Sequence, residues 1–161
     1  MLHIAPEMAL THRFRQINNL DYISIDLYDH SAMIKMDITD LQFPDAYFDV
    51  IYCSHVLEHV KDDQKAMLEL LRVLHPDGWA VLLVPITSKV TIEDPSITDP
   101  IERERLFGQY DHVRRYGPDI QDRLKAAGFK VTILKTGDLA GTQEIQRMGL
   151  SENDRLYVCS K

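Results

Sequence analysis

A helix pattern between two apolar strand patterns is the feature that most restricts the fold of this chain. Residues 79–86 are almost continuously apolar, which is typical of a strand buried on both faces of a parallel sheet. Residues 48–53 form a similar strand pattern before it. An apolar stripe at helical spacing lies between them and consists of Met67, Leu70, Leu71 and Leu74. The stripe predicts a helix over 62–75, ended by the Pro-Asp-Gly sequence at 76–78, and thus a parallel strand–helix–strand unit.

The rest of the chain continues the alternation of strands and helices. Strand patterns are found at 2–5, 22–25, 32–36, 129–134 and 155–159, helix patterns at 8–17 and 119–127, and a polar, irregular segment at 87–118. This order predicts a three-layer α/β fold with an antiparallel last strand, and 161 residues predict a single domain over 1–161. The second and third strands are too close in sequence for a crossover helix. The third strand is therefore rudimentary, or its crossover helix has been lost.

Glycine positions and charge exclude several function classes. All seven glycines lie at or after Gly78, so the first half has neither a dinucleotide-binding fingerprint nor a phosphate-binding P-loop. A net charge of −7 argues against a nucleic-acid partner. No apolar stretch approaches the roughly 20 residues that cross a membrane, and no signal-peptide pattern begins the chain. Cys53 and Cys159 predict buried free thiols, and we expect a soluble cytoplasmic protein.

Acidic residues follow two successive strands of the predicted sheet. In open α/β sheets, ligands bind at the carboxyl ends of the strands where the strand order reverses. Asp26 can accept two hydrogen bonds from a ribose diol there, and Asp37 can accept one from an adenine amino group while Ile38 packs on the ring. The alternative is that both aspartates are ordinary turn and cap residues.

Four segments in order resemble the class I S-adenosylmethionine-dependent methyltransferase family. They are MDITDLQFPDAYFDVI at 36–51, SHVLEHV at 54–60, ELLRVLHPDG at 69–78 and LKAAGF at 124–129. The resemblance implies a Rossmann-like, mostly parallel sheet of seven strands with helices on both faces. It also implies S-adenosylmethionine as cofactor, methyl transfer to a small-molecule or sugar-like acceptor, and Ser54 or His55 beside the methionine end of the cofactor.

The first loop departs from the family pattern. The family has an acidic, glycine-rich loop after strand one, whereas this chain has Ala5, Glu7 and Ala9. Glu7 can compensate by pairing with the ammonium group of the cofactor. The chain also begins at strand one, without the N-terminal helices that often cover the cofactor in this family. We therefore expect an open site, or one completed by a second copy or a partner chain.

The polar segment 87–118 is the predicted acceptor side. It follows a buried strand whose carboxyl end lies near the methyl group, and Tyr110, Arg114 and Arg115 can bind an anionic or sugar-like acceptor. The alternative is a solvated loop or a subunit contact. His112 is the first candidate for the base that removes the acceptor's proton, and His59 is the second.

Two other functions compete with methyl transfer. The sequence His55-Val56-Leu57-Glu58-His59 matches the H-x-x-E-H pattern of zinc peptidases, which places both histidines on one face of a helix. The third ligand would be a residue such as Glu69 or His112, and we expect no bound metal because the pattern is short. A non-catalytic methyltransferase-like module for protein association is the second alternative, favoured by the glycine-free first loop.

Overall fold

The computed structural model describes residues 1–147, 151 and 155–161. The strands are β1 (Leu2–Ile4), β2 (Ile23–Asp26), β3 (Ile34–Lys35), β4 (Phe48–Ser54), β5 (Leu74–Leu83), β6 (Ile92–Glu93), β7 (Arg114–Arg115), β8 (Lys130–Lys135) and β9 (Arg155–Ser160). The helices are α1 (Met8–Arg15), α2 (Asp63–Val73), α3 (Pro100–Phe107), α4 (Ile120–Ala126), α5 (Thr136–Leu139) and α6 (Thr142–Arg147). No helix in these ranges is long and apolar enough to span a membrane.

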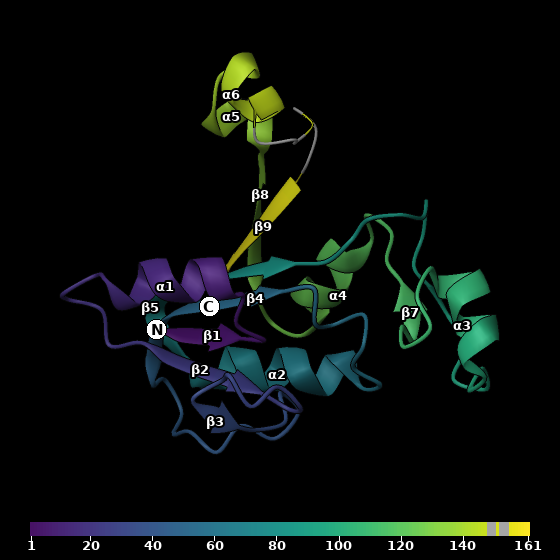
Figure 1. Ribbon diagram of the computed structural model, residues 1–161, viewed down its shortest axis with the longest axis horizontal. Coiled ribbons are helices and arrows are strands. Elements are labelled where there is room, and N and C mark those ends of the chain that lie inside the picture. The colour runs from purple at the N-terminus through teal and green to yellow at the C-terminus, as the bar shows by residue number, and fades with distance from the viewer. Residues whose placement is uncertain (148–150, 152–154) are drawn as a thin grey trace.

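Seven of the described strands form one sheet in the order β3-β2-β1-β4-β5-β9-β8. The pairs from β3 to β5 are parallel, and β9 runs antiparallel to both β5 and β8. Helices α1 and α2 lie on opposite faces of this sheet (Figure 1). The predicted Rossmann-like, mostly parallel sheet with an antiparallel last strand is thereby confirmed. The strand order reverses between β1 and β4, which places a ligand site at their carboxyl ends.

The third strand is rudimentary, as one of the two sequence-based alternatives expected. β3 has two residues, both exposed, and Ile34 and Lys35 pair with the end of β2. The connection over 27–33 consists of turns and bends. This connection begins with a turn stabilised by Asp26, whose Oδ1 accepts hydrogen bonds from the backbone N–H groups of Tyr28 and Asp29 at 2.6 and 2.7 Å.

The junction of α2 and β5 differs from the prediction. The helix ends at Val73 rather than at His75, because Leu74 already has extended backbone and pairs with Phe48 of β4. The Pro-Asp-Gly sequence lies within β5 at an irregularity where the strand register shifts. Gly78 is required there, since a Cβ on it would lie 2.7 Å from the carbonyl oxygen of Asp49.

Only one face of β5 is fully covered, so the prediction of burial on both faces was wrong. Ala80 and Leu82 are buried, whereas Trp79 is 47% exposed on the other face. That face carries a groove of about 260 Å³ beside α1, lined by Met1, Phe14, Ile17, Leu20, Val50, Tyr52, Trp79 and Val81. The sequence of a strand with only one buried face is still continuously apolar when the residues on its exposed face are also apolar.

The segment 87–118 is more regular than its composition predicts. It contains β6, α3 and β7. Asp99 caps α3 by accepting the N–H groups of Ile101 and Glu102, and Gly108 ends the helix with a φ of 94°. The connection between β8 and β9, where the sequence showed no helix pattern, likewise contains α5 and α6, and residues 148–150 and 152–154 of it lie outside the described residues.

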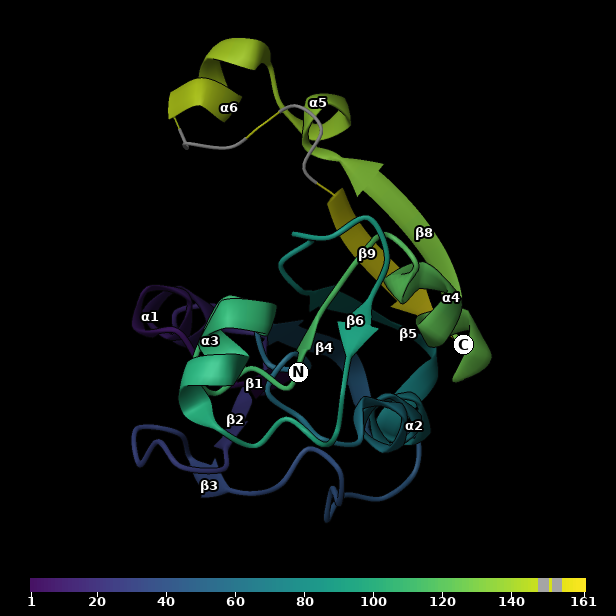
Figure 2. The same cartoon turned by 90° about the vertical axis from the view of Figure 1, so that its right-hand side faces the viewer.

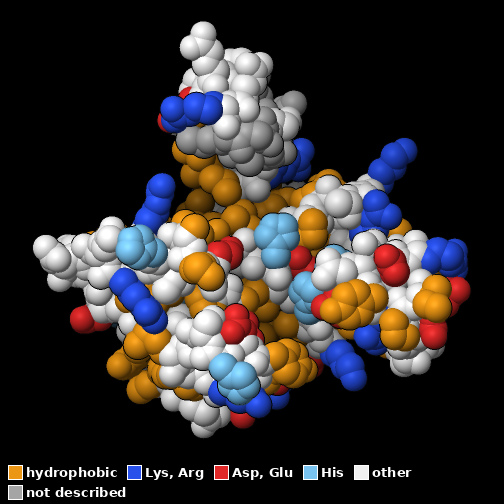
Figure 3. All heavy atoms as spheres, viewed as in Figure 1, with side chains coloured by type: hydrophobic (Ala, Val, Ile, Leu, Met, Phe, Trp, Pro, Cys, Tyr) orange, Lys and Arg blue, Asp and Glu red, His pale blue; other side chains and the backbone are white. Residues whose placement is uncertain are grey.

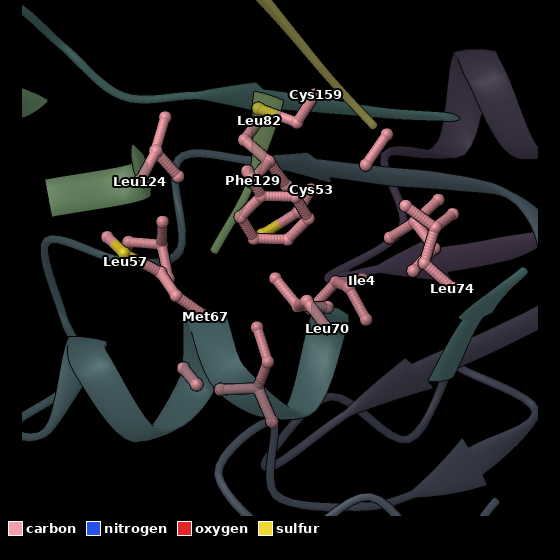
Figure 4. Packing of buried hydrophobic residues seen from close by; sticks show 14 of the residues in the cluster. Ile4, Cys53, Leu57, Met67, Leu70, Leu74, Leu82, Leu124, Phe129 and Cys159 are labelled. Carbon is pink, nitrogen blue, oxygen red and sulfur yellow. The ribbon is translucent and has the colours of Figure 1, made fainter. Parts of the chain in front are cut away.

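The core lies between α2 and the sheet. Met67 and Leu70 of α2 are fully buried and lie in one cluster with Cys53, Leu82 and Phe129 (Figure 4). Both cysteines are buried and unpaired, as the sequence predicts.

A comparison of two leucines on α2 tests this packing. Leu70→Ala removes a fully buried side chain and is expected to lower the free energy of unfolding by about 2–5 kcal/mol. Leu68 is 52% exposed on the same helix, so Leu68→Ala is expected to change stability by about 0.5 kcal/mol or less. Urea denaturation followed by circular dichroism measures both, and equal losses would contradict the assigned core face.

Candidate functional site

A cavity of about 610 Å³ opens at the carboxyl ends of the central strands, next to the point where the strand order reverses. Its volume is in the range of small-molecule sites. One part of it, the strand-end part, is lined by Ala5, Asp26, Asp37, Ile38 and His55. The other, the loop part, is lined by His59, Lys61, Arg103, Asp111 and Val113. Figures 1 and 2 show α3 beyond the carboxyl ends of the strands.

Two strained residues end the central strands at this cavity. Ala5 after β1 has a φ of 49°, and His55 after β4 has a φ of 54°. Non-glycine residues in this left-handed region are uncommon, cost on the order of 1–3 kcal/mol and cluster at functional sites. Their backbones are held by neighbouring strands, because the N–H of Ala5 donates to Ile25 and that of His55 to Leu83. The chain thus makes the turn after β1 without the expected glycine.

The two predicted acidic residues both reach the strand-end part. Both backbone hydrogen bonds to Asp26 end on Oδ1, so the other carboxylate oxygen is left for a ligand hydroxyl. Oδ1 of Asp37 accepts the N–H and the hydroxyl of Thr39 at 2.8 Å. The alternative, that both are turn residues, is therefore confirmed, since each carboxylate stabilises its loop with one oxygen. Their contacts with a ribose and an adenine stay predictions. Ile38 beside them is buried.

Two predicted cofactor residues are not among the lining residues. The carboxylate of Glu7 lies 2.7 Å from Nε2 of His3, a fully buried ring whose Nδ1 contacts the hydroxyl of Tyr22 at 2.9 Å. Glu7 thus orients His3 with one carboxylate oxygen, and its expected pairing with a ligand ammonium group stays a prediction. Ser54 is the last residue of β4 and is buried. The neighbouring His55 faces the cavity instead.

The predicted acceptor side has a different composition from the one expected. Segment 87–118 does line the loop part, but through Arg103, Asp111 and Val113. Tyr110 is 60% exposed and not among the lining residues. Arg115 lies outside the cavity and donates to the hydroxyl of Thr87 at 2.9 Å.

Arg114 is a buried structural residue, and its prediction as a substrate-binding residue was wrong. Its side chain is 3% exposed. The guanidinium donates to the carbonyl oxygens of Leu57 at 2.7 Å and Lys61 at 2.8 Å, and also to that of Val60. It further donates to a carboxylate oxygen of Glu93 at 3.0 Å. These contacts hold β7 against the turn that follows β4.

The H-x-x-E-H pattern lies in this turn and not on a helix. Residues 57–59 form a turn with hydrogen bonds from His59 to Val56 and from Val60 to Leu57. His55 and His59 therefore do not share a helical face, which removes the geometry of the zinc-peptidase prediction. Glu69, one of its possible third ligands, is bound by the guanidinium of Arg72 at 2.7 Å.

The two imidazoles predicted to act on the acceptor lie together. The rings of His59 and His112 meet edge to face with centroids 4.6 Å apart, and His59 lines the cavity while His112 packs beside it. Burial lowers the pKa of His59 below its usual value although Asp111 opposes the shift, so this ring is neutral at pH 7. Figure 3 shows histidine side chains close together near the middle of one face, next to acidic side chains.

Several lining residues were missed by sequence reasoning. Tyr28 directly follows the Asp26 turn, so its position after a strand end was a usable signal. Arg103 lies in α3 and Asp111 follows this helix, whose Asp-Pro start and glycine end were present in the sequence. Glu58, which is not among the lining residues, was named only within the H-x-x-E-H pattern, because its burial depends on contacts with residues more than 50 positions away.

Known proteins resemble this chain in sequence and in fold. The family profile described as a methyltransferase domain matches residues 3–82. The ubiquinone/menaquinone biosynthesis C-methyltransferase UbiE of Vibrio campbellii is 42% identical over 50 residues, which cover 31% of this chain and 19% of that protein. The matched part thus spans about a fifth of that relative's length.

Two solved structures share the fold over nearly the whole chain. An S-adenosylmethionine-dependent methyltransferase from Mesorhizobium loti has a TM-score of 0.65 at 15% identity, covering 99% of this chain and 90% of that one. A complex of the Haloferax volcanii Trm112 methyltransferase activator with a methyltransferase gives a TM-score of 0.66 at 13% identity, covering 99% and 80%. The sheet, the site and these likenesses define a Rossmann-like methyltransferase domain. The chain belongs to the class I S-adenosylmethionine-dependent methyltransferase family.

Two neighbouring arginines on β7 give a matched test of the site's framework. Arg114→Met leaves three carbonyl oxygens and a carboxylate without their buried donor, so a loss of about 3–5 kcal/mol in the free energy of unfolding is expected. Arg115→Met removes one hydrogen bond at the surface, and a loss of about 1 kcal/mol or less is expected. Guanidinium denaturation measures both. Similar stabilities of the two variants would show that Arg114 is not structural.

Proposed function

We propose that this chain binds S-adenosylmethionine in the strand-end part of the cavity and transfers its methyl group to a small molecule bound in the loop part. The observation that carries the proposal is the position of Asp26, at the end of β2 on the cavity, with one carboxylate oxygen left for a ligand. A ribose diol donates hydrogen bonds to such an oxygen. Family membership supports the choice of this nucleoside over others.

The residues of the strand-end part fit the chemistry of this donor. Asp37 offers an acceptor for the adenine amino group, and the buried Ile38 offers an apolar surface for the ring. The left-handed turn at Ala5 brings backbone to the cavity in the place where the family has glycine. The bound donor supplies an electrophilic methyl group on a sulfonium. His55 at the end of β4 faces that group's side of the cavity, which opens toward His59.

The loop part fits a small polar acceptor. Lys61 and Arg103 offer cationic donors, Asp111 offers an acceptor, and Val113 offers apolar surface. A cavity of this size holds one donor and one small acceptor rather than a macromolecule. The acceptor's position beside the methyl group is the main catalytic contribution, because methyl transfer from a sulfonium depends on alignment.

The similarity to UbiE does not identify the methyl acceptor of this chain. UbiE is named for ubiquinone and menaquinone biosynthesis, and its match covers less than a third of this chain. Our choice of a hydroxyl- or amine-bearing small molecule rests on the residues of the loop part alone. A partner chain or second copy over the cavity stays a prediction, and light scattering on the purified protein tests it.

Asp26 and the nearby Asp29 provide a matched test of donor binding. Asp26→Asn keeps an oxygen for the turn but replaces the other oxygen by an amide donor. S-adenosylmethionine affinity is expected to fall about 10- to 100-fold, the equivalent of roughly 1.5–3 kcal/mol. Asp29→Asn changes an exposed loop carboxylate that accepts from the backbone of Ser31, and it is expected to leave affinity unchanged. Isothermal titration calorimetry measures both.

Two results would contradict the proposal. If the wild-type chain binds no S-adenosylmethionine, the alternative of a non-catalytic association module becomes the better explanation. If it binds the donor but Asp26→Asn has wild-type affinity and melting temperature, Asp26 does not hold the ribose.

A further inference from the structure

Glu58, His59 and His112 bring three metal-binding side chains together at the loop part of the cavity. Each offers one ligand atom, and these atoms lie within 4.8 Å of one another. Metal–ligand bonds of about 2.0–2.2 Å place ligand atoms up to about 4.4 Å apart across an ion. Movements of a few tenths of an ångström would therefore close the three side chains around one ion.

The carboxylate of Glu58 has an oxygen without a partner. The residue is 1% exposed, and its Oε2 is buried with no hydrogen-bond partner among the described residues. The other oxygen, Oε1, lies 3.4 Å from Nδ1 of His55. Buried polar atoms almost always have a hydrogen-bond partner or a ligand, so the unpaired Oε2 of Glu58 indicates a partner from outside the chain.

Both imidazoles are oriented by a partner on Nδ1. In His59, this nitrogen lies 3.2 Å from a carboxylate oxygen of Asp111. In His112, it lies 3.2 Å from the carbonyl oxygen of Phe107. Both partners accept hydrogen bonds, so Nδ1 carries the proton in each ring and the lone pair is on Nε2. Histidines that bind metals are typically oriented in this way by a carboxylate or a carbonyl.

The two segments that carry these side chains are fastened together. The N–H of Val113 donates to the carbonyl oxygen of Glu58 at 2.9 Å, and Arg114 binds the carbonyl oxygens on either side of it. The cluster is therefore preorganised and does not require a folding step to form.

We propose that Glu58, His59 and His112 bind one divalent transition-metal ion. Two imidazoles with one carboxylate suit ions such as zinc, iron, cobalt or manganese and leave coordination positions open. Magnesium and calcium prefer sites made of oxygen ligands alone. Because His59 lines the cavity, the open positions face the acceptor. The proposal thus departs from the sequence-based expectation of no metal, with a ligand set other than a helical His55–His59 pair.

This site identifies the acceptor class, an inference that rests on the proposed methyl transfer. The acceptor is an oxygen nucleophile, a hydroxyl or a vicinal diol, whose oxygen binds the ion and whose proton is released to water. An oxygen lone pair then forms the bond to the methyl carbon, while the electron pair of the sulfur–carbon bond stays on sulfur. The products are a methyl ether and a neutral thioether, and the ion does not change its oxidation state. In this role His59 and His112 are ligands and do not act as bases.

Cobalt binding to the metal-free chain tests the site directly. After EDTA treatment and desalting, Co²⁺ is titrated without S-adenosylmethionine and followed by visible absorption and calorimetry. One ion per chain is expected. His112→Ala and the isosteric Glu58→Gln are each expected to lower affinity more than about tenfold, and Asp111→Asn about 10- to 100-fold through the orientation of His59.

Matched controls separate this proposal from the methyl-transfer proposal. His12→Ala removes an exposed histidine of α1 and is expected to keep wild-type Co²⁺ binding. In EDTA, His112→Ala is expected to bind S-adenosylmethionine with wild-type affinity and to have a native circular dichroism spectrum. Specific Co²⁺ binding without donor binding would support the metal site and refute methyl transfer. Wild-type Co²⁺ affinity in both Glu58→Gln and His112→Ala would overturn the metal site.

Discussion

The loop part of the cavity depends on the side chain of Arg114. Its guanidinium donates hydrogen bonds to the carbonyl oxygens of Leu57 and Lys61. These residues belong to a turn, so no helical hydrogen bonds are made to their carbonyl groups. A buried carbonyl without a donor is costly, so this turn keeps its shape only while β7 lies against it. The same contact brings the segment after α3 to the end of β4. Side chains of the turn after β4 and of the segment before β7 meet there because Arg114 donates hydrogen bonds to the backbone of that turn.

Arg114 is tolerated in the interior because its charge is balanced. Asp63 at the start of α2 lies 3.6 Å from it, and Arg123 of α4 binds the same carboxylate at 2.8 Å. Although burial opposes ionisation of Asp63, hydrogen bonds from Arg123 and Tyr116 lower the pKa of this carboxyl below its usual value. Such groups become costly when one partner is removed. The network therefore couples the turn after β4 to α2 and α4.

The strand-end part of the cavity could be predicted from sequence, whereas the loop part could not. Asp26 and Asp37 follow strands directly, and the positions of strand ends are set by local patterns and by sheet topology. Arg114 was misassigned because a buried arginine and a substrate-binding arginine look alike in sequence. The role of Glu58 depends on a hydrogen bond from Val113, a contact across 55 positions that leaves no local pattern. The short H-x-x-E-H pattern contains two residues of the proposed metal site, Glu58 and His59, and His112 was one of its two possible third ligands. The pattern nevertheless implied a helix where the chain forms a turn, and His55 as a ligand.

The backbone conformations of the two parts of the cavity are stabilised by different interactions. At the strand ends, Ala5 and His55 adopt left-handed backbone without glycine, and hydrogen bonds to the adjacent strands β2 and β5 hold them. Strain of this kind persists only where the surroundings are rigid, and the central strands of a parallel sheet are the most rigid elements available. The loop part lacks such a frame and replaces it with buried charges and backbone hydrogen bonds from Arg114. In the proposed reaction the acceptor occupies the loop part, whose wall is determined by a few side-chain contacts.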